Sequence, residues 1–371
     1  RSRDTLCAAA DVARYPELVA QDLGGFSSGT GSTALIKRVP IGPVLAISPF
    51  NFPLNLVTHK LAPAIAAGCP VLLKPASQTP SPALLLAEIL DEAGLPKGGL
   101  SVMPCRGSDI SPLIDDERFK LLTFTGSQEV GWGLKQRAWR KRVTLELGGN
   151  AAVIVEPDGG DLGEIARALA GAAYGYAGQS CISVQRILVH RSCLDELRSK
   201  LVAEVEALPY GDPADEATVC GPLIDRENAD RVESWVQQAV DAGGRLLTGG
   251  RREGAVVRPA LLEDVPTDQP VVADEVFGPA AVLFGYDDFE QALELTNDSR
   301  YGLQAGIYSK DIDKIRRAWD VLEVGGLVQG GPPTWRCDPM PYGGAKDSGV
   351  GREGPIYAYT EMTEERLLVL R

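Results

Sequence analysis

The chain has 371 residues, 44% of them hydrophobic, which is enough to bury a large core in about two or three domains. Its 50 acidic and 37 basic residues give a formal net charge of -13, which would repel a phosphate backbone and excludes nucleic acid as an expected partner. The longest apolar stretches, such as 39–49 and 280–284, are too short to cross a bilayer, and the charged first residues contain no signal-peptide core. We therefore expect a soluble cytoplasmic protein without a membrane partner.

Short β-like runs alternate with longer helical segments along most of the chain. In the first part the expected strands are 34–39, 44–48, 71–73, 101–103 and 120–124, and the expected helices are 54–67, 82–93, 111–115 and 129–138. In the second part the expected strands include 151–154 and 186–189, and the expected helices include 162–174, 194–207 and 225–242. This alternation predicts βαβ units, so the expected fold class is α/β with two doubly wound, Rossmann-like lobes. The glycine- and serine-rich residues 24–32 are interpreted as a flexible linker.

The seven cysteines are scattered, odd in number and never spaced as Cys-X-X-Cys. This pattern argues against a disulfide framework. Only two histidines, His59 and His190, are present, so a metal site or a Cys-His pair is also hard to build. We therefore expect no metal, and we expect a carboxylate to be the base for any reactive cysteine.

Cys181 is the most informative residue. It ends the run Gly-Gln-Ser-Cys at 178–181, between a small-residue stretch and a strand-like segment, so its thiol is expected at a loop-to-strand junction. Upstream, Glu146 lies just before the pair Gly148 and Gly149. A thiol nucleophile and a carboxylate base are the groups needed to make and then hydrolyse a thioester. Taken alone, however, Cys181 could be a small buried hydrophobe and Glu146 a solvated residue at the end of a strand.

Seven motifs, in matching order, resemble the aldehyde dehydrogenase superfamily from about residue 39 to the C-terminus. They are Ser-Pro-Phe-Asn-Phe-Pro (48–53), Lys-Pro-Ala-Ser (74–77), Phe-Thr-Gly-Ser (124–127), Leu-Glu-Leu-Gly-Gly-Asn (145–150), Gly-Gln-Ser-Cys (178–181), Glu-Val-Phe-Gly-Pro (275–279) and Tyr-Gly-Gly-Ala-Lys-Asp-Ser-Gly-Val-Gly-Arg-Glu (342–353). The resemblance implies NAD(P)-dependent oxidation of an aldehyde to its carboxylic acid through a cysteine thiohemiacetal and a thioester. It is nearest to the branch that acts on lactaldehyde, phosphonoacetaldehyde or succinic semialdehyde.

The resemblance assigns three catalytic roles. Cys181 would be the nucleophile, and the oxyanion would accept hydrogen bonds from the Cys181 backbone N–H and from the side-chain amide of Asn51. Glu146 would remove a proton from Cys181 or from the hydrolytic water. Its presence favours hydrolysis over transfer of the acyl group to coenzyme A. Read without the family, Asn51 would be an ordinary turn residue.

The resemblance also implies a site for NAD or NADP. Gly126, Ser127 and Gly131 follow an expected strand and open a helix, whose N-terminal amides can hold a pyrophosphate. Lys74 would contact the adenosine ribose, and Glu275 and Phe277 would hold the nicotinamide ribose and ring. NAD-preferring members often carry a Glu three residues after that lysine, and this chain has Ser77. A carboxylate there would repel a 2′-phosphate and a serine does not, so we expect NADP to be accepted.

Three residues are candidates for contacts with the substrate. His59 and Arg336 align with positions that line the aldehyde tunnel, and Tyr342 follows in the same loop region. A bidentate Arg336 would suit an anionic substrate tail. Ser180 stands where phosphonate-binding relatives place a second arginine, which argues against a doubly charged substrate. His59 could equally be a satisfied helix residue, and Arg336 a surface charge.

The expected domain organisation follows the same resemblance. Residues 1–149 would form the cofactor-binding domain, with an oligomerisation hairpin at about 30–43 and the catalytic domain at 150–342. Residues 343–356 would return to the cofactor domain and 357–371 would form an oligomerisation strand. An exposed strand edge favours self-association, so a homodimer or homotetramer is expected.

Two departures from the family pattern support an alternative. Family members usually have about a hundred more residues before the Asn51 motif than this chain, and they usually carry Asn where this chain has Gly330. The alternative is a catalytically impaired aldehyde dehydrogenase-like module kept for binding or oligomerisation. We favour the enzyme because Asn51, Glu146 and Cys181 are all present.

Overall fold

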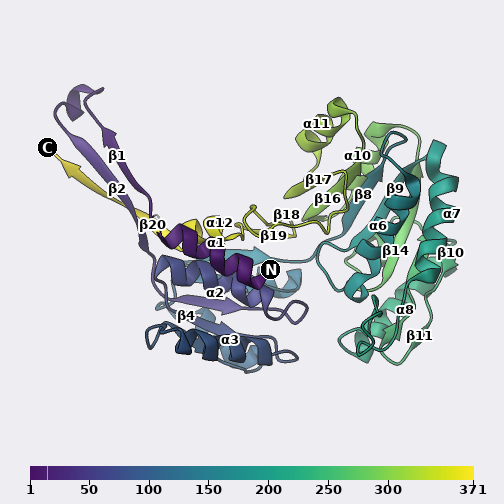
Figure 1. Cartoon of the computed structure of the whole chain (residues 1–371), viewed down its shortest axis with the longest axis horizontal. Coiled ribbons are helices and arrows are strands. Elements are labelled where there is room, and N and C mark those ends of the chain that lie inside the picture. Colours follow the sequence, from purple (N-terminus) through teal and green to yellow (C-terminus); the bar gives the residue numbers. More distant parts are fainter. Residues whose placement is uncertain (15) are drawn as a thin grey trace. The chain divides into compact units, whose positions relative to one another are not determined.

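The computed structural model describes residues 1–14 and 16–371, and these form two compact units (Figure 1). Unit 1 comprises residues 1–146, 337–343 and 350–371, and unit 2 comprises residues 147–336 and 344–349. The first boundary lies close to the expected division after residue 149. The sequence predicts that the chain returns to the cofactor domain once, at residue 343. In the structure, residues 337–343 already belong to unit 1, and residues 344–349 then belong to unit 2.

Unit 1 is built on a sheet with the strand order β19-β7-β6-β3-β4-β5, which is parallel from β7 to β5. Its strands are β3 (Val44–Ile47), β4 (Val71–Lys74), β5 (Leu100–Val102), β6 (Leu121–Thr125), β7 (Arg142–Glu146) and the short β19 (Gly349–Val350). Its helices are α1 (Ser2–Arg14), α2 (Asn55–Ala67), α3 (Ser81–Glu92), α4 (Gly107–Ile110), α5 (Gln128–Arg137) and α12 (Pro355–Glu361). Apolar residues of α2, α3 and the central strands share one buried cluster that stabilises the sheet.

The sequence prediction for unit 1 missed helix α1. Only Thr5 and Ala9 of α1 are fully buried, and Leu6 and Val12 are half-buried, so the helix buries little apolar surface. The helix packs against α2 and α12. The expected helix 111–115 is a 3₁₀ turn, Ser111–Ile114, which directly follows α4.

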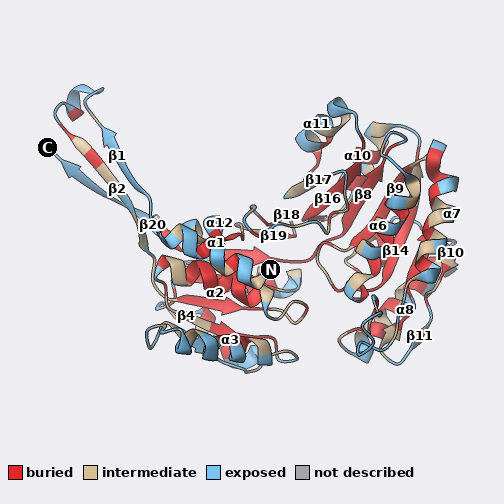
Figure 2. Ribbon diagram, in the orientation of Figure 1, coloured by how far each residue is buried: buried red, intermediate tan, exposed pale blue. Residues whose placement is uncertain are grey.

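A separate antiparallel sheet in unit 1 contains β1 (Leu18–Asp22), β2 (Thr33–Pro40) and β20 (Thr363–Leu370), in the order β1-β2-β20. Strand β2 pairs with β20 along its whole length, from Thr33 opposite Leu370 to Pro40 opposite Thr363. Residues 24–32 join β1 to β2 as a closed hairpin loop, with Leu23 N–H donating to Ser32 O, and they do not link two domains. Figure 2 shows β1 and β20 exposed, in contrast to the buried strands of the parallel sheet.

Unit 2 is built on a seven-stranded sheet with the order β10-β13-β14-β9-β8-β16-β17, parallel except at β10. Its strands are β8 (Ala151–Val155), β9 (Val184–His190), β10 (Arg245–Thr248), β13 (Ala260–Glu263), β14 (Ala280–Tyr286), β16 (Gln304–Tyr308) and β17 (Gly326–Gln329). The remaining short strands are β11 (Arg252–Glu253), β12 (Val256–Val257), β15 (Tyr301–Gly302) and β18 (Ala345–Lys346). The helices are α6 (Leu162–Tyr174), α7 (Arg191–Ala207), α8 (Arg226–Asp241), α9 (Pro270–Ala273), α10 (Phe289–Asn297) and α11 (Ile312–Val321). The prediction of an α/β fold with two doubly wound lobes is confirmed.

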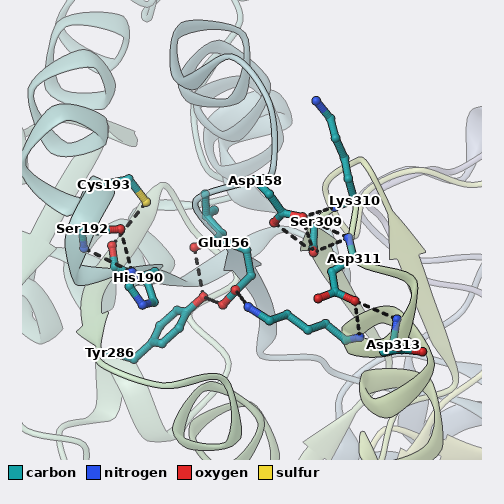
Figure 3. Close-up of polar contacts among 12 residues, drawn as sticks. Glu156, Asp158, His190, Ser192, Cys193, Tyr286, Ser309, Lys310, Asp311 and Asp313 are labelled. Carbon is teal, nitrogen blue, oxygen red and sulfur yellow. Dashed lines mark hydrogen bonds and ion pairs between the residues drawn. The ribbon is translucent and has the colours of Figure 1, made fainter.

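A polar network with a buried centre at Tyr286 and Glu156 lies at the carboxyl ends of the central strands of unit 2 (Figure 3). The fully buried Tyr286 donates from its hydroxyl to Val155 O, 3.0 Å away, and to a carboxylate oxygen of Glu156, 2.5 Å away. The second carboxylate oxygen of Glu156 pairs with Lys314 on α11. Asp158 accepts hydrogen bonds from the Ser309 hydroxyl and from two backbone amides at the start of α11. These contacts tie β8, β14 and α11 together.

Over the part of the chain that the structure describes, we find no helix with the length and apolar character needed to cross a membrane.

Candidate active site

The turn that carries Cys181 is conformationally strained. It begins in a 3₁₀ turn, Gly175–Gly178, in which Tyr176, Ala177 and Gly178 all have left-handed backbones with φ of 58°, 55° and 67°. Non-glycine residues adopt this conformation at a cost of about 1–3 kcal/mol each, so such strain persists only where the surroundings impose it. Cys181 lies two residues after Gln179 and shortly before β9. It is partly exposed. The predicted position at a loop-to-strand junction is therefore where the structure places it.

Glycines allow three motifs of unit 2 to pack against one another. A Cβ on Gly149 would overlap the carbonyl oxygen of Cys181, and a Cβ on Gly178 would overlap the carbonyl oxygen of Gly278. A Cβ on Gly148 would lie 2.5 Å from a carboxylate oxygen of Glu275. Only glycine fits at these close approaches. The Gly-Gly pair, the cysteine turn and the Glu275 segment thus form one cluster.

Glu275 is the titratable group of this cluster whose pKa is most clearly shifted. It accepts a hydrogen bond of 2.8 Å from the backbone N–H of Gly149. Burial raises the pKa of Glu275 to about 7, although the Gly149 N–H and the charge of Arg231 oppose the rise. Phe277, two residues on, has a positive φ of 44°. Both predicted nicotinamide contacts therefore lie on the segment that packs against the Cys181 turn.

Gln185 was missed by the sequence reasoning. Its buried side-chain amide donates to Asp274 O at 2.6 Å and accepts from the backbone N–H of Val276 at 3.0 Å, on either side of Glu275. The available signal was a polar side chain at the second position of strand β9, whose residues 187–189 are apolar. Arg231 supports the same segment by donating to Val276 O at 2.7 Å. Both residues hold the backbone that presents Glu275.

In unit 1 the predicted residues gather at the carboxyl edge of the parallel sheet. Strand pairing places Ile47 beside Lys74 and beside Phe124, and Thr125 beside Glu146. Asn51 follows β3, Gly126 follows β6, and Glu146 ends β7; Asn51 and Glu146 are buried. This edge is where open α/β sheets bind ligands.

The turn after β6 has the features of a pyrophosphate site. The N–H of Gly126 donates to Glu146 O, Ser127 has an extended backbone, and α5 begins at the next residue. The first amides of α5 are therefore positioned at the end of the strand, where a helix N-terminus favours an anion. Gly131 is buried in the first turns of α5 and donates to Ser127 O.

Lys74 and Ser77 follow β4 at the same edge. Lys74 is buried, and its ammonium donates to the carbonyl oxygen of Pro75 at 2.8 Å. Burial lowers the pKa of Lys74, an effect that Cys105 partly offsets. The Ser77 hydroxyl is exposed and donates to Cys105 O at 3.3 Å. The loop after β4 therefore combines a cation with a neutral hydroxyl.

Successive residues of α2 form two buried polar contacts with carboxylates in the C-terminal part of unit 1. His59 pairs with Asp338 at 3.2 Å, and Lys60 pairs with Glu353 at 3.1 Å. Lys60 also donates to the hydroxyls of Thr123 and Thr125 at 3.0 and 2.7 Å. Glu353 is joined through its backbone to the buried Tyr342, with hydrogen bonds in both directions. His59 thus has a buried carboxylate partner, and its predicted contact with the substrate stays a prediction.

Gly343 brings the chain close to Glu146. A Cβ on Gly343 would lie 2.8 Å from a carboxylate oxygen of Glu146. Arg336 is partly buried and is the last residue of the first segment of unit 2. Gly330 has a φ of 70°, a left-handed conformation that glycine adopts freely and that Asn tolerates better than other residues. The backbone of Gly330 is therefore one that an Asn at this position could also adopt.

These features define a class: an α/β enzyme with a dinucleotide-type helix turn in one unit and, in the other, a cysteine turn packed against the segment of a partly buried glutamate. The chain belongs to the aldehyde dehydrogenase family, whose model matches residues 2–368. It is accordingly an oxidoreductase that acts on aldehydes with NAD or NADP.

Three similar proteins show how far the likeness extends. The 3-sulfolactaldehyde dehydrogenase of Priestia megaterium is 47% identical over 338 residues, which cover 91% of this chain and 71% of that protein. Aldehyde dehydrogenase 21 of Physcomitrella patens, solved with its reaction product succinate, is 46% identical with a TM-score of 0.96, and the match covers 100% of this chain and 77% of that one. The NADP-dependent glyceraldehyde-3-phosphate dehydrogenase of Bacillus halodurans, solved with NADP, is 35% identical with a TM-score of 0.96, and the match covers 100% and 78%.

Proposed function

We propose that this chain oxidises a small, singly charged anionic aldehyde to the free carboxylic acid, with Cys181 as the nucleophile. The observation that carries the proposal is the packing of the Cys181 turn against Gly149 and, through Gly178, against the Glu275 segment. A partly exposed thiol held on a strained turn is the arrangement expected of a catalytic cysteine.

The proposed reaction has an acylation half and a hydrolysis half. The Cys181 thiolate attacks the aldehyde carbon, and the resulting oxyanion accepts hydrogen bonds from the Cys181 N–H and from the Asn51 amide. A bound dinucleotide would supply the hydride acceptor, and loss of hydride from this carbon would leave a thioester on Cys181. Glu146 then takes a proton from water as its oxygen attacks the thioester, and the acid leaves as the thiolate is restored.

The residues present fit a dinucleotide. The first amides of α5, with Gly126 and Ser127, suit the pyrophosphate, and the buried Lys74 suits a ribose or phosphate oxygen. Glu275 and Phe277 suit the nicotinamide end. Ser77 has no charge to repel a 2′-phosphate, so we propose that NADP is accepted at least as well as NAD. The NADP held by the Bacillus halodurans relative supports this choice.

The anionic substrate class is supported by Arg336 and by the chemistry of two similar proteins. A sulfolactaldehyde carries a sulfonate and succinate carries a carboxylate at the end remote from the reacting carbon. A guanidinium such as that of Arg336 binds either group through two parallel hydrogen bonds. Ser180, directly before the nucleophile, adds no second cation, which favours one negative charge over two.

The test is a panel of aldehydes offered with NAD and NADP separately, following the absorbance of the reduced nicotinamide. We expect turnover with succinic semialdehyde and with sulfonated short aldehydes, and none from Cys181→Ala. Arg336→Gln should raise KM for these anionic aldehydes and leave KM for propanal unchanged. No reduced nicotinamide with any aldehyde would instead favour a binding or oligomerisation module. An equal effect of Arg336→Gln on propanal would contradict the anionic class.

We also propose that the β1-β2-β20 sheet assembles copies of this chain into a homodimer or homotetramer. Every residue of β1 is exposed, and β20 exposes four successive apolar residues, Leu367, Leu368, Val369 and Leu370. An exposed apolar strand of this kind favours pairing with another chain.

A further inference from the structure

We infer that His59 and Asp338 form a positioning pair that sets the affinity for the anionic substrate by fixing the chain beside Arg336. The inference rests on the proposed role of Arg336 and extends it to two residues that have no part in the chemical steps. His59 thus acts through Asp338, and neither residue is assigned a contact with the substrate.

The pair is well enclosed. His59 is 2% exposed and Asp338 is 5% exposed. His59 Nε2 donates to Asp338 Oδ1 at 3.2 Å, and Arg1 on the chain before α1 donates to the same oxygen at 3.3 Å. The Thr5 hydroxyl of α1 donates to Oδ2 at 3.1 Å. Both carboxylate oxygens are therefore engaged, by residues from α1, the chain before it and α2.

The charges make this contact strong. Burial alone would raise the pKa of Asp338, but the hydrogen bond and charge of His59, with the charge of Arg1, hold it well below its ordinary range. Asp338 is therefore an anion at neutral pH. An anion buried this far requires its partners, because removing one leaves an uncompensated charge in the interior.

The chain around Arg336 is held on both sides. Before it, the side-chain amide of Gln304 donates to Pro333 O at 2.5 Å and to Trp335 O at 3.3 Å, all within unit 2. After it, Asp338 is held by His59 within unit 1. Only Cys337 separates Arg336 from this anchor.

The second end of the same segment is fixed by the next residue of α2. Tyr342 is joined to Glu353 through backbone hydrogen bonds, and Glu353 is paired with Lys60. Residues 338–342 are thus attached to α2 at both ends through His59 and Lys60. Rotation of Asp338 away from His59 would release the end nearer Arg336 and leave the Tyr342 end in place.

A guanidinium that binds an anion through two hydrogen bonds depends on its orientation, so a loosened main chain weakens that contact selectively. The bond-making groups, Cys181, Asn51 and Glu146, lie on other segments of the chain. Loss of the pair should consequently change KM for an anionic aldehyde and leave kcat nearly unchanged.

The experiment compares succinic semialdehyde with propanal as probes, using the full chain and saturating NADP. His59→Leu and Asp338→Asn should each raise KM for succinic semialdehyde by about tenfold, the effect of losing roughly one charge-assisted hydrogen bond. For both variants, KM for propanal and kcat for either aldehyde should stay within about twofold. His59→Gln, which keeps a hydrogen-bond donor, should recover part of the affinity.

A double variant covers the case in which a buried charge left alone prevents folding. His59→Leu combined with Asp338→Leu removes the buried carboxylate together with its imidazole partner, and it should fold and show the same selective increase in KM as one single variant. Equal losses on both aldehydes, or no change in KM for succinic semialdehyde, would overturn the positioning role.

Arg336→Gln separates this inference from the proposed substrate class. One outcome is that Arg336→Gln raises KM for succinic semialdehyde selectively while the His59 and Asp338 variants do not. That result would overturn the positioning role and leave the proposed substrate class standing. If Arg336→Gln shows no selectivity either, the proposed substrate class itself fails.

Discussion

Glu275 illustrates how burial sets the behaviour of a single residue at this site. Its carboxyl pKa rises from 4.5 to about 7, with desolvation as the largest cause. The folded protein therefore binds a proton at Glu275 more tightly than the unfolded chain does. The contribution of this proton to stability is present below about pH 4.5 and is lost as the pH rises to about 7.

Replacing Glu275 by Gln should remove this pH dependence. The comparison is made without the dinucleotide. As the pH is raised from 5 to 7.5, the thermal midpoint of the native protein should decrease relative to that of Glu275→Gln, because ionising a buried carboxyl is unfavourable. Thermal unfolding of both proteins across this range is the measurement. Parallel curves for the two proteins would show that Glu275 is already ionised at pH 5.

Gly149 offers a second test at the residue scale. In Gly149→Ala the new methyl group overlaps the carbonyl oxygen of Cys181, so the nucleophile must shift. We expect kcat to fall by about 10²-fold, the cost of a displacement of roughly 1 Å at a reacting group. Gly171→Ala on α6 is the matched control, because nothing lies within 4 Å of its added Cβ. Steady-state kinetics of both variants should separate them, and similar rates would contradict the close approach.

At the scale of the elements, the sequence predicted regular strands and helices well and irregular turns poorly. Helix α6 has the predicted bounds, because its apolar positions repeat with helical period over the whole segment. The strained turn at 176–178 was not predicted, because Tyr and Ala are not residue types that indicate a left-handed backbone. Gln185 and Arg231, which hold the backbone on either side of Glu275, come from other elements and could not be found from local patterns.

The network around Glu156 gives a prediction about the stability of these elements. Tyr286→Phe removes the hydroxyl that donates to Val155 O and to Glu156. Leaving these buried acceptors without that donor should lower the free energy of unfolding by about 1–3 kcal/mol. Urea unfolding measures the loss, and Tyr210→Phe, at an exposed position of unit 2, should cost far less. A loss no larger than that of the control would indicate that the network adds nothing to stability.

At the scale of the whole molecule, the chain passes between the two units several times after residue 336. The sequence predicts that the chain enters the catalytic domain once and returns to the cofactor domain once, because the motif at 342–353 is one continuous stretch of sequence. Strand β18 pairs with β15 in unit 2, whereas the Tyr342 to Glu353 bridge belongs to unit 1, and these pairings divide the segment. Pairing between distant residues is not encoded in local composition.

Assembly also belongs to this scale. Leu368→Glu combined with Leu370→Glu places charges on the exposed residues of β20 and should convert the assembled protein to monomers. Sedimentation at micromolar concentration measures the change. Trp319→Glu, at a more exposed apolar position on α11, is the control and should leave the mass unchanged. An unchanged mass in the β20 variant would place the interface elsewhere.

The most direct measurement of the central claim is a rapid-mixing experiment on Glu146→Gln. If Cys181 forms the thioester and Glu146 assists its hydrolysis, this variant should release about one equivalent of reduced nicotinamide per site in a fast burst and then turn over slowly. The mass of the quenched protein should rise by the acyl group, located on Cys181. Steady turnover by Cys181→Ala, or a burst without an adduct on Cys181, would contradict the claim.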